Sequence, residues 1–235
     1  LEPGSKKPSH FFNSFFFHKL LSTDEFGVLG KRRHRHVKNY ARKIKSTEGN
    51  VFKLDELYIP VNVGNNHWTL CVADIPARRI EYYDSYSGSG ATYMKALRYY
   101  LKREARKWNG DASTDQGLLN LHEWELLEVK TPTQSNAYDC GVFTCIFANY
   151  ISQGLDFRFS ADNMGHFRER ITFDLLHAME EIRGYDSARE LVGKWDEEMR
   201  RDLLWNSMEE SHRKCAIRQG KVAAKDQQWC CLLYT

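Results

Sequence analysis

The chain lacks a long hydrophobic run, which argues against a helix that spans a membrane. None of its apolar segments approaches the roughly 18 residues that such a helix needs. The first residues also lack the pattern of a secretory signal peptide, because Asn13, Ser14 and His18 interrupt the phenylalanine cluster there. We therefore expect an intracellular protein that does not associate with a membrane.

A strong excess of charge of one sign is also missing. The 34 basic residues are nearly balanced by 31 acidic ones, and the resulting formal net charge of +3 is too small to favour nucleic acid as a partner. The six cysteines lack the spacing of a disulfide framework and fit a reducing compartment. We expect neither a metal nor a cofactor, because the one conceivable metal cluster has no standard spacing. That cluster would consist of His212, Cys215, Cys230 and Cys231.

Hydrophobic residues make up 42% of the 235 residues and aromatic residues 13%, which is enough to fill a sizeable core. We expect one domain over residues 1–185. Residues 186–235 are rich in charge and are predicted to form a helical tail that opens with a capping box at Ser187–Glu190. No motif in this tail indicates a role for it.

Hydrophobic periodicity predicts a mixture of helices and strands. The segments Trp68–Asp74 and Arg79–Asp84 are separated by a short turn and have the pattern of an antiparallel hairpin. Another strand is expected at 57–63, where Pro60 favours an edge or a bulged position. Helical spacing occurs at 10–21, 37–45, 92–108 and 164–182, and a further strand is expected at 124–129.

The helix predicted at 37–45 carries basic side chains on its outer face, and the basic run 31–36 precedes it. Its apolar residues are expected on the other face; they are Val37, Tyr40, Ala41 and Ile44. Such a basic run is usually a solvated surface. The alternatives are a docking patch for an acidic partner and a nuclear-import signal.

The segment 134–154 contains a candidate nucleophile. Apolar residues at helical spacing follow Cys140, and Gly154 stands where a glycine commonly ends a helix. Cys140 is therefore expected in the first turn, where the free N–H groups and the helix dipole stabilise a thiolate. The simpler interpretation is one more small buried residue. Asp139 is expected to cap the helix, with its carboxylate on backbone N–H groups and away from the sulfur.

A cysteine nucleophile needs a base, and the base usually needs a group that orients it. His67 stands at the start of the first hairpin strand, and Asp84 ends the second one. Because the start of one hairpin strand lies beside the end of the next, we expect these two residues to be neighbours. Asp84 can then hold one ring N–H of His67.

Two residues near Cys140 fit the remaining needs of such a site. Gln134 lies in the loop that enters the helix, and its side-chain amide can donate to an oxyanion together with the backbone N–H of Cys140. Gly141 leaves the approach to the sulfur free of a side chain. Two further cysteines, Cys71 and Cys145, are expected to be packed structural thiols.

The order of these residues resembles that of the ubiquitin-like-protein proteases, the SUMO (sentrin)-specific cysteine peptidases of the adenain clan. The resemblance covers roughly residues 10–183. The matching segments are His67-Trp68-Thr69-Leu70, Tyr83-Asp84-Ser85, Gln134 and Asp139-Cys140-Gly141-Val142-Phe143, with further agreement at 11–16, 59–62 and 164–171.

This resemblance implies an α+β, papain-like or adenain-like fold in which helices flank a central, mostly antiparallel sheet and the nucleophile begins a helix. It also implies the roles of the site residues. Trp68 is implied to form one wall of a narrow channel over the C-terminal Gly-Gly of a modifier. The catalytic residues implied are the nucleophile Cys140, the base His67, the orienting Asp84 and the oxyanion donor Gln134.

The implied activity is that of a thiol isopeptidase or endopeptidase, a hydrolase that acts on a SUMO-like or other ubiquitin-like modifier and its conjugates. The resemblance further implies a nuclear location and a monomer. Acidic surfaces on such modifiers would suit the basic region 31–45. The family usually begins with a Trp-Leu-(Asn/Asp)-Asp segment that supplies the other channel wall, so we expect this chain to be incomplete at its N-terminus.

Other functions use similar residues. One alternative is an endopeptidase or an acyltransferase of the same clan with a different substrate. Another is a modifier-binding module that is catalytically impaired. Papain-like enzymes in the narrow sense are disfavoured because they place the cysteine before the histidine, and chymotrypsin-like viral proteases are disfavoured because helices flank the cysteine here.

Overall fold

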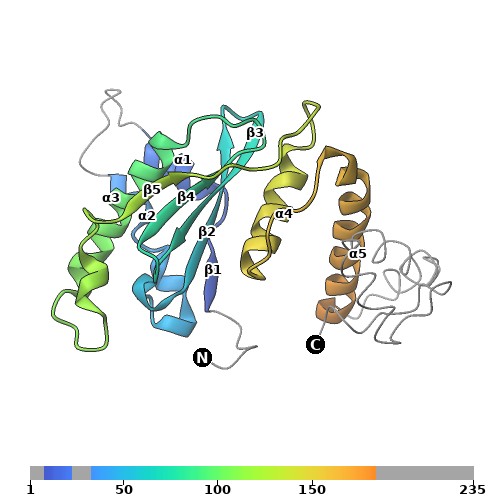
Figure 1. Ribbon diagram of the computed structural model, residues 1–235. Helices are drawn as coiled ribbons and strands as arrows, with labels where there is room; N and C mark the ends of the chain where they lie inside the picture. Colours follow the sequence, from blue (N-terminus) through green and yellow to red (C-terminus); the bar gives the residue numbers. More distant parts are fainter. Residues whose placement is uncertain (1–7, 23–32, 184–235) are drawn as a thin grey trace, which may run out of the picture. The chain divides into compact units, whose positions relative to one another are not determined.

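A five-stranded sheet forms the centre of the computed structural model of this chain (Figure 1). The structure describes residues 8–22 and 33–183. They fall into two units, divided after Phe157, and each unit is described by itself. In spatial order the strands are β1 (Ser9–Phe11), β2 (Glu56–Val63), β3 (His67–Asp74), β4 (Arg79–Tyr83) and β5 (Glu125–Glu128).

The sheet is mixed, and the predicted hairpin lies at its centre. Strands β2, β3 and β4 are antiparallel to one another, whereas the outer strands β1 and β5 run parallel to their neighbours. In the predicted hairpin, Leu70 of β3 pairs with Tyr83 of β4. The α+β fold is therefore confirmed, with an antiparallel centre and parallel outer strands.

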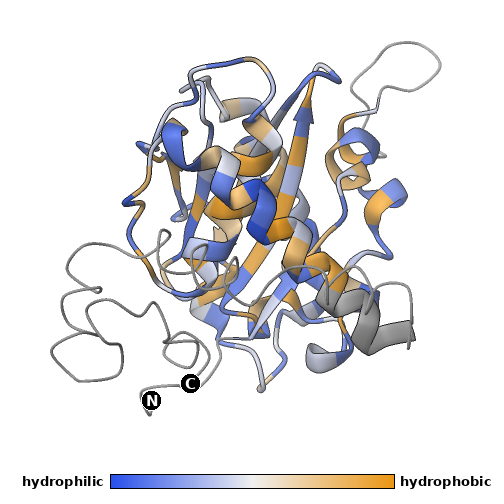
Figure 2. Cartoon of the chain, turned by 90° about the vertical axis from the view of Figure 1, so that its right-hand side faces the viewer, coloured by the Kyte–Doolittle hydropathy of each residue, from blue (hydrophilic) through white to orange (hydrophobic). Residues whose placement is uncertain are grey.

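Helices cover both faces of the sheet (Figure 1). Helices α1 (Phe15–Leu21), α2 (Arg33–Val37) and α3 (Ala91–Trp108) lie on one face, and α4 (Cys140–Ser152) lies on the other against β3. Alternate strand residues point to opposite faces. Cys71 and Ile80 therefore join the core with α1 and α3, while the Tyr83 ring packs 6.1 Å from Phe147 of α4. Figure 2 shows hydrophobic residues along the strands, as expected when both faces are covered.

The start of α3 depends on a glycine beside the sheet. A Cβ atom on Gly90 would lie only 2.1 Å from Cγ of Tyr82, so the chain can approach β4 this closely only without a side chain. The Tyr82 ring is itself fixed, because it stacks at 6.0 Å on Tyr93 and its hydroxyl accepts a hydrogen bond from Thr69 at 2.9 Å.

Pro60 lies in the part of β2 that has no neighbouring strand on the β1 side among the described residues. Strand β1 pairs only with Glu56–Tyr58. The N–H of Phe12 donates to the carbonyl of Tyr58, so main-chain groups of Tyr58 and Pro60 point away from β3. The edge position predicted for this strand is therefore correct around Pro60, although β2 is an inner strand where it pairs with both β1 and β3. The missing N–H of Pro60 costs no hydrogen bond of the ladder.

The continuous helix predicted at 37–45 is wrong. Helix α2 ends at Val37, and two short 3-10 turns follow, η1 (Ala41–Lys43) and η2 (Lys45–Thr47). The predicted apolar side is nevertheless largely correct, since Val37, Ala41 and Ile44 are buried. Ile44 becomes buried in a non-helical conformation, with ψ at 86°, and this conformation interrupts the helix.

Helix α4 ends as its sequence predicts. Gly154 has φ +66°, and its N–H donates to the carbonyl of Ile151. The next N–H, of Leu155, donates to the carbonyl of Tyr150, which completes a Schellman motif. The remaining short helices of this unit are η3 (Val51–Lys53) and η4 (Gln116–Leu119).

The second unit contains η5 (Ala161–Asn163) and α5 (Met164–Arg183). The side chain of Ser160 accepts a hydrogen bond from the N–H of Asp162, and Ser160 and Asn163 form a capping box. The helix predicted at 164–182 is thereby confirmed. The predicted tail 186–235, with its capping box and its cysteines, lies outside the described residues. Within the described ranges, no helix is both long and apolar enough to cross a membrane.

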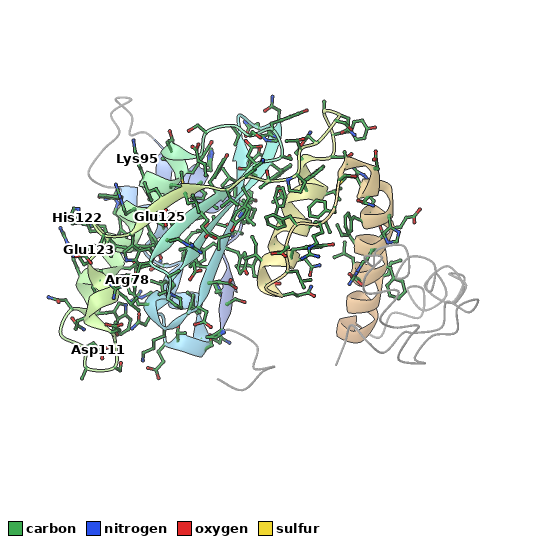
Figure 3. All side chains as sticks on the ribbon, viewed as in Figure 1. Arg78, Lys95, Asp111, His122, Glu123 and Glu125 are labelled. Atoms are coloured by element: carbon green, nitrogen blue, oxygen red, sulfur yellow. The ribbon has the colours of Figure 1, made fainter. Side chains whose placement is uncertain are left out.

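Charged side chains gather around α3 and β5 (Figure 3). Arg78 and Glu123 form an exposed ion pair with 3.7 Å between Nη1 and Oε2. His34 of α2 contacts the buried Glu104 of α3, with 2.7 Å between Nε2 and Oε1. The segment after residue 32 is therefore attached to α3, on the face of the sheet opposite α4.

Candidate active site

The hairpin brings His67 and Asp84 together at one end of the sheet. A tight turn precedes β3, in which Gly64 and Asn65 have φ near +60°. His67 is the first residue of β3, and Asp84 directly follows β4. Nε2 of His67 lies 2.6 Å from Oδ1 of Asp84, so the contact predicted from the hairpin is present.

The carboxylate of Asp84 is held by the backbone of the loop that follows it. The N–H of Tyr86 donates to Oδ1 at 2.8 Å, and the N–H of Gly88 donates to Oδ2 at 3.0 Å. An ionised carboxylate can only accept hydrogen bonds, so the proton between Asp84 and His67 belongs to Nε2 of the ring. The neutral imidazole therefore keeps its lone pair on Nδ1.

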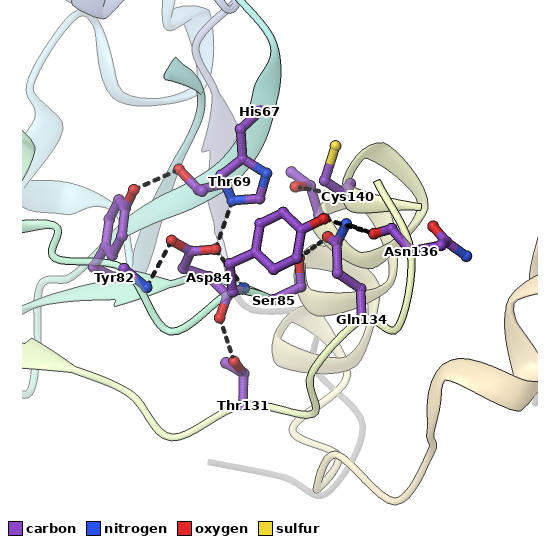
Figure 4. A network of polar contacts seen from close by, with 12 residues as sticks. His67, Thr69, Tyr82, Asp84, Ser85, Thr131, Gln134, Asn136 and Cys140 are labelled. Carbon is purple, nitrogen blue, oxygen red and sulfur yellow. Dashed lines mark hydrogen bonds and ion pairs between the residues drawn. The ribbon is translucent and has the colours of Figure 1, made fainter. Parts of the chain in front are cut away.

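Nδ1 of His67 is buried and has no hydrogen-bond partner among the described residues. Figure 4 shows this nitrogen on the side of the ring that faces Cys140. The ring is held in place by Tyr86, whose own ring lies 4.9 Å away. The arrangement leaves one basic nitrogen on a fixed ring, directed toward a thiol.

Cys140 is the first residue of α4, as predicted, and only 5% of its surface is exposed. The N–H of Phe143 donates to the carbonyl of Asp139, so the helix leaves the N–H of Cys140 without an intrahelical partner. The predicted capping by Asp139 is wrong. Its side chain makes no capping bond and instead accepts from Nδ2 of Asn136 at 2.7 Å, because the backbone of Asp139 is itself helical.

Gln134 is buried beside the start of α4 (Figure 4). Its Oε1 accepts a hydrogen bond from Oγ of Ser85, and its backbone N–H donates to the carbonyl of Ser85 at 3.0 Å. Its Nε2 donates to the carbonyl of Asn136. One of the two amide hydrogens on Nε2 is left for another acceptor.

The loop between Gln134 and Cys140 is organised by Asn136. Its Oδ1 accepts from the N–H groups of Tyr138 and Asp139, both at 3.0 Å. Its carbonyl also accepts from the hydroxyl of Tyr86 at 2.7 Å. This loop is therefore tied to the end of β4 on the same side as the His67 ring.

Trp68 lies close to the residue after Cys140. Its side chain is half-buried, and a Cβ atom on Gly141 would lie 3.8 Å from Cδ1 of the indole. Because Gly141 has no side chain, the space between the indole and the first turn of α4 is bounded only by backbone on the helix side. A side chain at position 141 would therefore come into van der Waals contact with the indole.

The two other described cysteines have different environments. Cys71 lies within β3 and is fully buried, as predicted, and this burial raises the pKa of its thiol. Cys145 is exposed on α4, so the prediction that it is packed is wrong. It lies five residues after Cys140, on the part of the helix surface turned away from the sheet. No group of three or more potential metal ligands occurs in the described part of the chain.

Four residues contribute to this arrangement for which the sequence predicted no role; they are Ser85, Tyr86, Gly88 and Asn136. Three of them belong to the loop that begins right after Asp84. The only signal in the sequence is their proximity to Asp84 and Gln134, because their contacts depend on how two distant loops meet.

The chain matches the profile of the Ulp1 protease family, C-terminal catalytic domain, over residues 2–181. It is 30% identical over 174 residues to a sentrin-specific protease of Caenorhabditis elegans and 32% identical over 177 residues to ubiquitin-like-specific protease 1A of Arabidopsis thaliana. These alignments cover 73% and 74% of this chain but only 22% and 32% of the two relatives. The chain thus spans a third or less of their length.

A solved structure with a similar fold is the C-terminal Ulp1 protease domain in complex with Smt3, the yeast ortholog of SUMO. The TM-score is 0.54 at 26% sequence identity, and the alignment covers 70% of this chain and 66% of that one.

Proposed function

Because the chain belongs to the Ulp1 protease family, we propose that it is a thiol isopeptidase or endopeptidase that cleaves after the C-terminal Gly-Gly of a SUMO-like modifier. One observation carries this proposal. His67 gives one nitrogen to Asp84 at 2.6 Å and keeps the other buried, without a partner, on the side of Cys140. A general base for a thiol needs such a free nitrogen on an oriented ring beside the nucleophile.

In the proposed reaction, Nδ1 of His67 takes the proton of the Cys140 thiol, and Sγ attacks the carbonyl carbon of the last glycine. Asp84 accepts the Nε2 hydrogen throughout and stabilises the resulting imidazolium. The tetrahedral intermediate collapses when Nδ1 returns the proton to the leaving amine. A thioester remains on Sγ, and water, deprotonated by the same nitrogen, hydrolyses it.

The negative charge on the oxygen of the intermediate needs hydrogen-bond donors. We assign this role to the free N–H on Nε2 of Gln134 and to the backbone N–H of Cys140. Both are fixed before substrate arrives, since Gln134 is buried and Cys140 begins a helix. Removing one such donor typically lowers the rate by about 100- to 1000-fold.

We propose that Trp68 and Gly141 line the path of the modifier's C-terminal glycines, because the indole lies beside a helix turn that carries no side chain at position 141. Glycine residues have no side chain and can pass between an indole and a helix backbone. The relatives support the same substrate class, because their names refer to sentrin and ubiquitin-like proteins, and the similar Ulp1 domain was solved with Smt3. Residues 1–185 are proposed to form the catalytic domain.

A panel of ubiquitin-like modifiers, each with a C-terminal electrophile in place of the scissile bond, tests the proposal. We expect the purified chain to form a covalent adduct with a SUMO-like modifier, visible as a mass shift. Cys140→Ala should abolish the adduct. Cys145→Ala is the matched control, because it removes an exposed thiol from the same helix, and it should leave the adduct unchanged.

The other outcomes of this panel identify the alternatives. Capture of a different ubiquitin-like protein alone would contradict the proposed substrate. Tight non-covalent binding without capture would favour a modifier-binding module, and an acetylated product formed from acetyl-CoA would favour the acyltransferase.

We further propose, on the basis of the family, that the protein is a monomer. We also propose that it is located in the nucleus, on the basis of the family and the basic run 31–36. Light scattering of the purified chain tests the monomer. Fluorescence microscopy of a tagged chain tests the location, and replacement of Lys31, Arg32 and Arg33 by glutamine should shift the signal to the cytoplasm. An unchanged nuclear signal would contradict a role of this run in import.

A further inference from the structure

Ser85 is a buried hydroxyl group for which the proposed reaction has no direct use. It directly follows Asp84, and only 1% of its surface is exposed. Its Oγ lies 2.5 Å from Oε1 of Gln134, and its carbonyl accepts the backbone N–H of Gln134 at 3.0 Å (Figure 4). Ser85 therefore holds Gln134 by both main chain and side chain.

The two ends of the Gln134 amide are distinguished by their partners. Oε1 only accepts hydrogen bonds, so the hydroxyl of Ser85 must be the donor. On the other side, Nε2 donates to the carbonyl of Asn136, which also only accepts. If the amide turned over, two oxygen atoms would face each other at Asn136. The observed orientation is therefore the one that satisfies both neighbours.

From these contacts we infer that Ser85 is a positioning residue for the oxyanion donor. Its hydroxyl fixes the amide plane of Gln134, so that the second N–H on Nε2 stays directed at the oxygen that becomes negative. Ser85 does not donate to that oxygen itself, because its one proton is committed to Oε1. This inference rests on the proposed function, in which Gln134 is the side-chain donor.

Without the hydroxyl, the Oε1 atom of Gln134 would be buried without its donor. A buried acceptor that loses its partner favours any movement that reaches water or another donor. The amide would then rotate about its last torsion, which has a broad energy profile. The donor would be present in the variant but directed elsewhere for much of the time.

Kinetics of Ser85→Ala, Gln134→Ala and the double variant, measured with a SUMO-like modifier that carries a C-terminal fluorogenic amide, test whether Ser85 acts through Gln134. We expect Ser85→Ala to lower kcat by roughly 10- to 100-fold, less than the loss of a whole donor, with KM little changed. In the Gln134→Ala background, Ser85→Ala should have no further effect. Multiplicative losses in the double variant would overturn the inference.

Three controls separate positioning from general damage. Ser85→Thr keeps the hydroxyl and should recover part of the rate. Ser89→Ala removes a hydroxyl from the same loop that bonds Glu128 at 2.6 Å, and it should leave kcat unchanged. Alkylation of Cys140 by iodoacetamide should keep its rate and pH profile in Ser85→Ala, because His67 and Asp84 are untouched. A shifted profile would mean that Ser85 acts on the base instead.

A readout without catalysis separates this inference from the proposed function. The side-chain amide resonances of Gln134 can be assigned by NMR from their loss in Gln134→Ala. In Ser85→Ala they should move to the values of a solvent-exposed glutamine. Resonances that stay in place would overturn the inference even if the chain cleaves SUMO. Resonances that move in a chain that cleaves no modifier would contradict only the proposed function.

Discussion

Because Gly88 has no side chain, its backbone can approach the carboxylate of Asp84 closely. Its N–H donates to Oδ2 of Asp84 at 3.0 Å, and a Cβ atom on this residue would lie 2.7 Å from the same oxygen. The backbone of Gly88 does not have a positive φ. Its importance is therefore steric, because the chain must pass very close to the carboxylate that orients His67.

Gly88→Ala should accordingly impair the base without unfolding the protein. The methyl group would displace the carboxylate of Asp84 and turn the ring of His67 away from Cys140. We expect kcat to fall roughly 10-fold or more, a part of what a well-placed general base contributes. The pH profile of Cys140 alkylation should also change. Steady-state kinetics and iodoacetamide labelling measure the two effects.

Gly88→Ala should be compared with Ser85→Ala, because the two variants are expected to affect different parts of the site. Both residues lie in one loop, but Gly88 contacts Asp84, which orients the proposed base, and Ser85 contacts Gln134, the proposed oxyanion donor. An alkylation profile that is unchanged in Gly88→Ala would contradict the contact with Asp84. Ser89→Ala, from the same loop, serves as the control for both.

Among the larger elements, α3 depends on how closely its start approaches β4. Gly90 precedes the helix, and the ring that it touches belongs to Tyr82, which is 2% exposed. That ring is fixed from two further sides by Tyr93 and Thr69. A flexible neighbour would yield to an added methyl group, but this ring has little room to move.

We expect Gly90→Ala to lower the free energy of unfolding by roughly 1–3 kcal/mol, the usual cost of overpacking a core. Urea unfolding followed by circular dichroism measures this change. Gly165→Ala is the control, because it also adds one methyl group to a helical segment and no heavy atom lies within 4 Å of the added Cβ. Equal stabilities of the two variants would show that the Tyr82 ring yields.

For the molecule as a whole, Cys71 provides an internal reporter of stability. It is fully buried at the centre of the sheet, and both burial and the nearby Glu81 raise the pKa of its thiol. At neutral pH the thiol is protonated, and no reagent reaches it until the sheet opens. Its alkylation therefore follows unfolding of the sheet rather than local motion.

Iodoacetamide labelling at neutral pH, followed by peptide mapping, should modify Cys140 at least about a thousandfold faster than Cys71, given the usual stability of a folded domain. Urea should speed the labelling of Cys71 in step with global unfolding. A Cys71 rate that does not depend on urea would mean that the centre of the sheet opens locally.

Much of the arrangement follows from local patterns in the sequence. The alternation of β3 and β4 and their short connection were enough to predict that His67 and Asp84 meet, and Gly154 was enough to predict the end of α4. The expected cap by Asp139 failed because its backbone is itself helical and because Asn136, three residues earlier, donates a hydrogen bond to that side chain. The break after Val37 could not be predicted, because Val37, Ala41 and Ile44 have helical spacing in the sequence and this spacing does not reveal the non-helical backbone of Ile44.

The contacts of Ser85, Gly88 and Asn136 could not be predicted in this way. The contacts of Ser85 and Asn136 join two loops that are separated by some fifty residues. The contact of Gly88 depends on the path of a loop near a carboxylate. Hydrophobic periodicity carries no information about such paths. A single sequence therefore indicates candidate catalytic residues better than it indicates the residues that hold them in place.

The open part of strand β2 affects how readily two molecules can associate. Beyond Tyr58 it lacks a neighbouring strand among the described residues, and open strand edges can template the addition of another chain. Pro60 removes an N–H group from this edge. Pro60→Val would supply the missing donor, and we expect that variant to form aggregates at concentrations where the unaltered chain stays dispersed. Pro60 would thus reduce aggregation, because it leaves this strand edge without one hydrogen-bond donor.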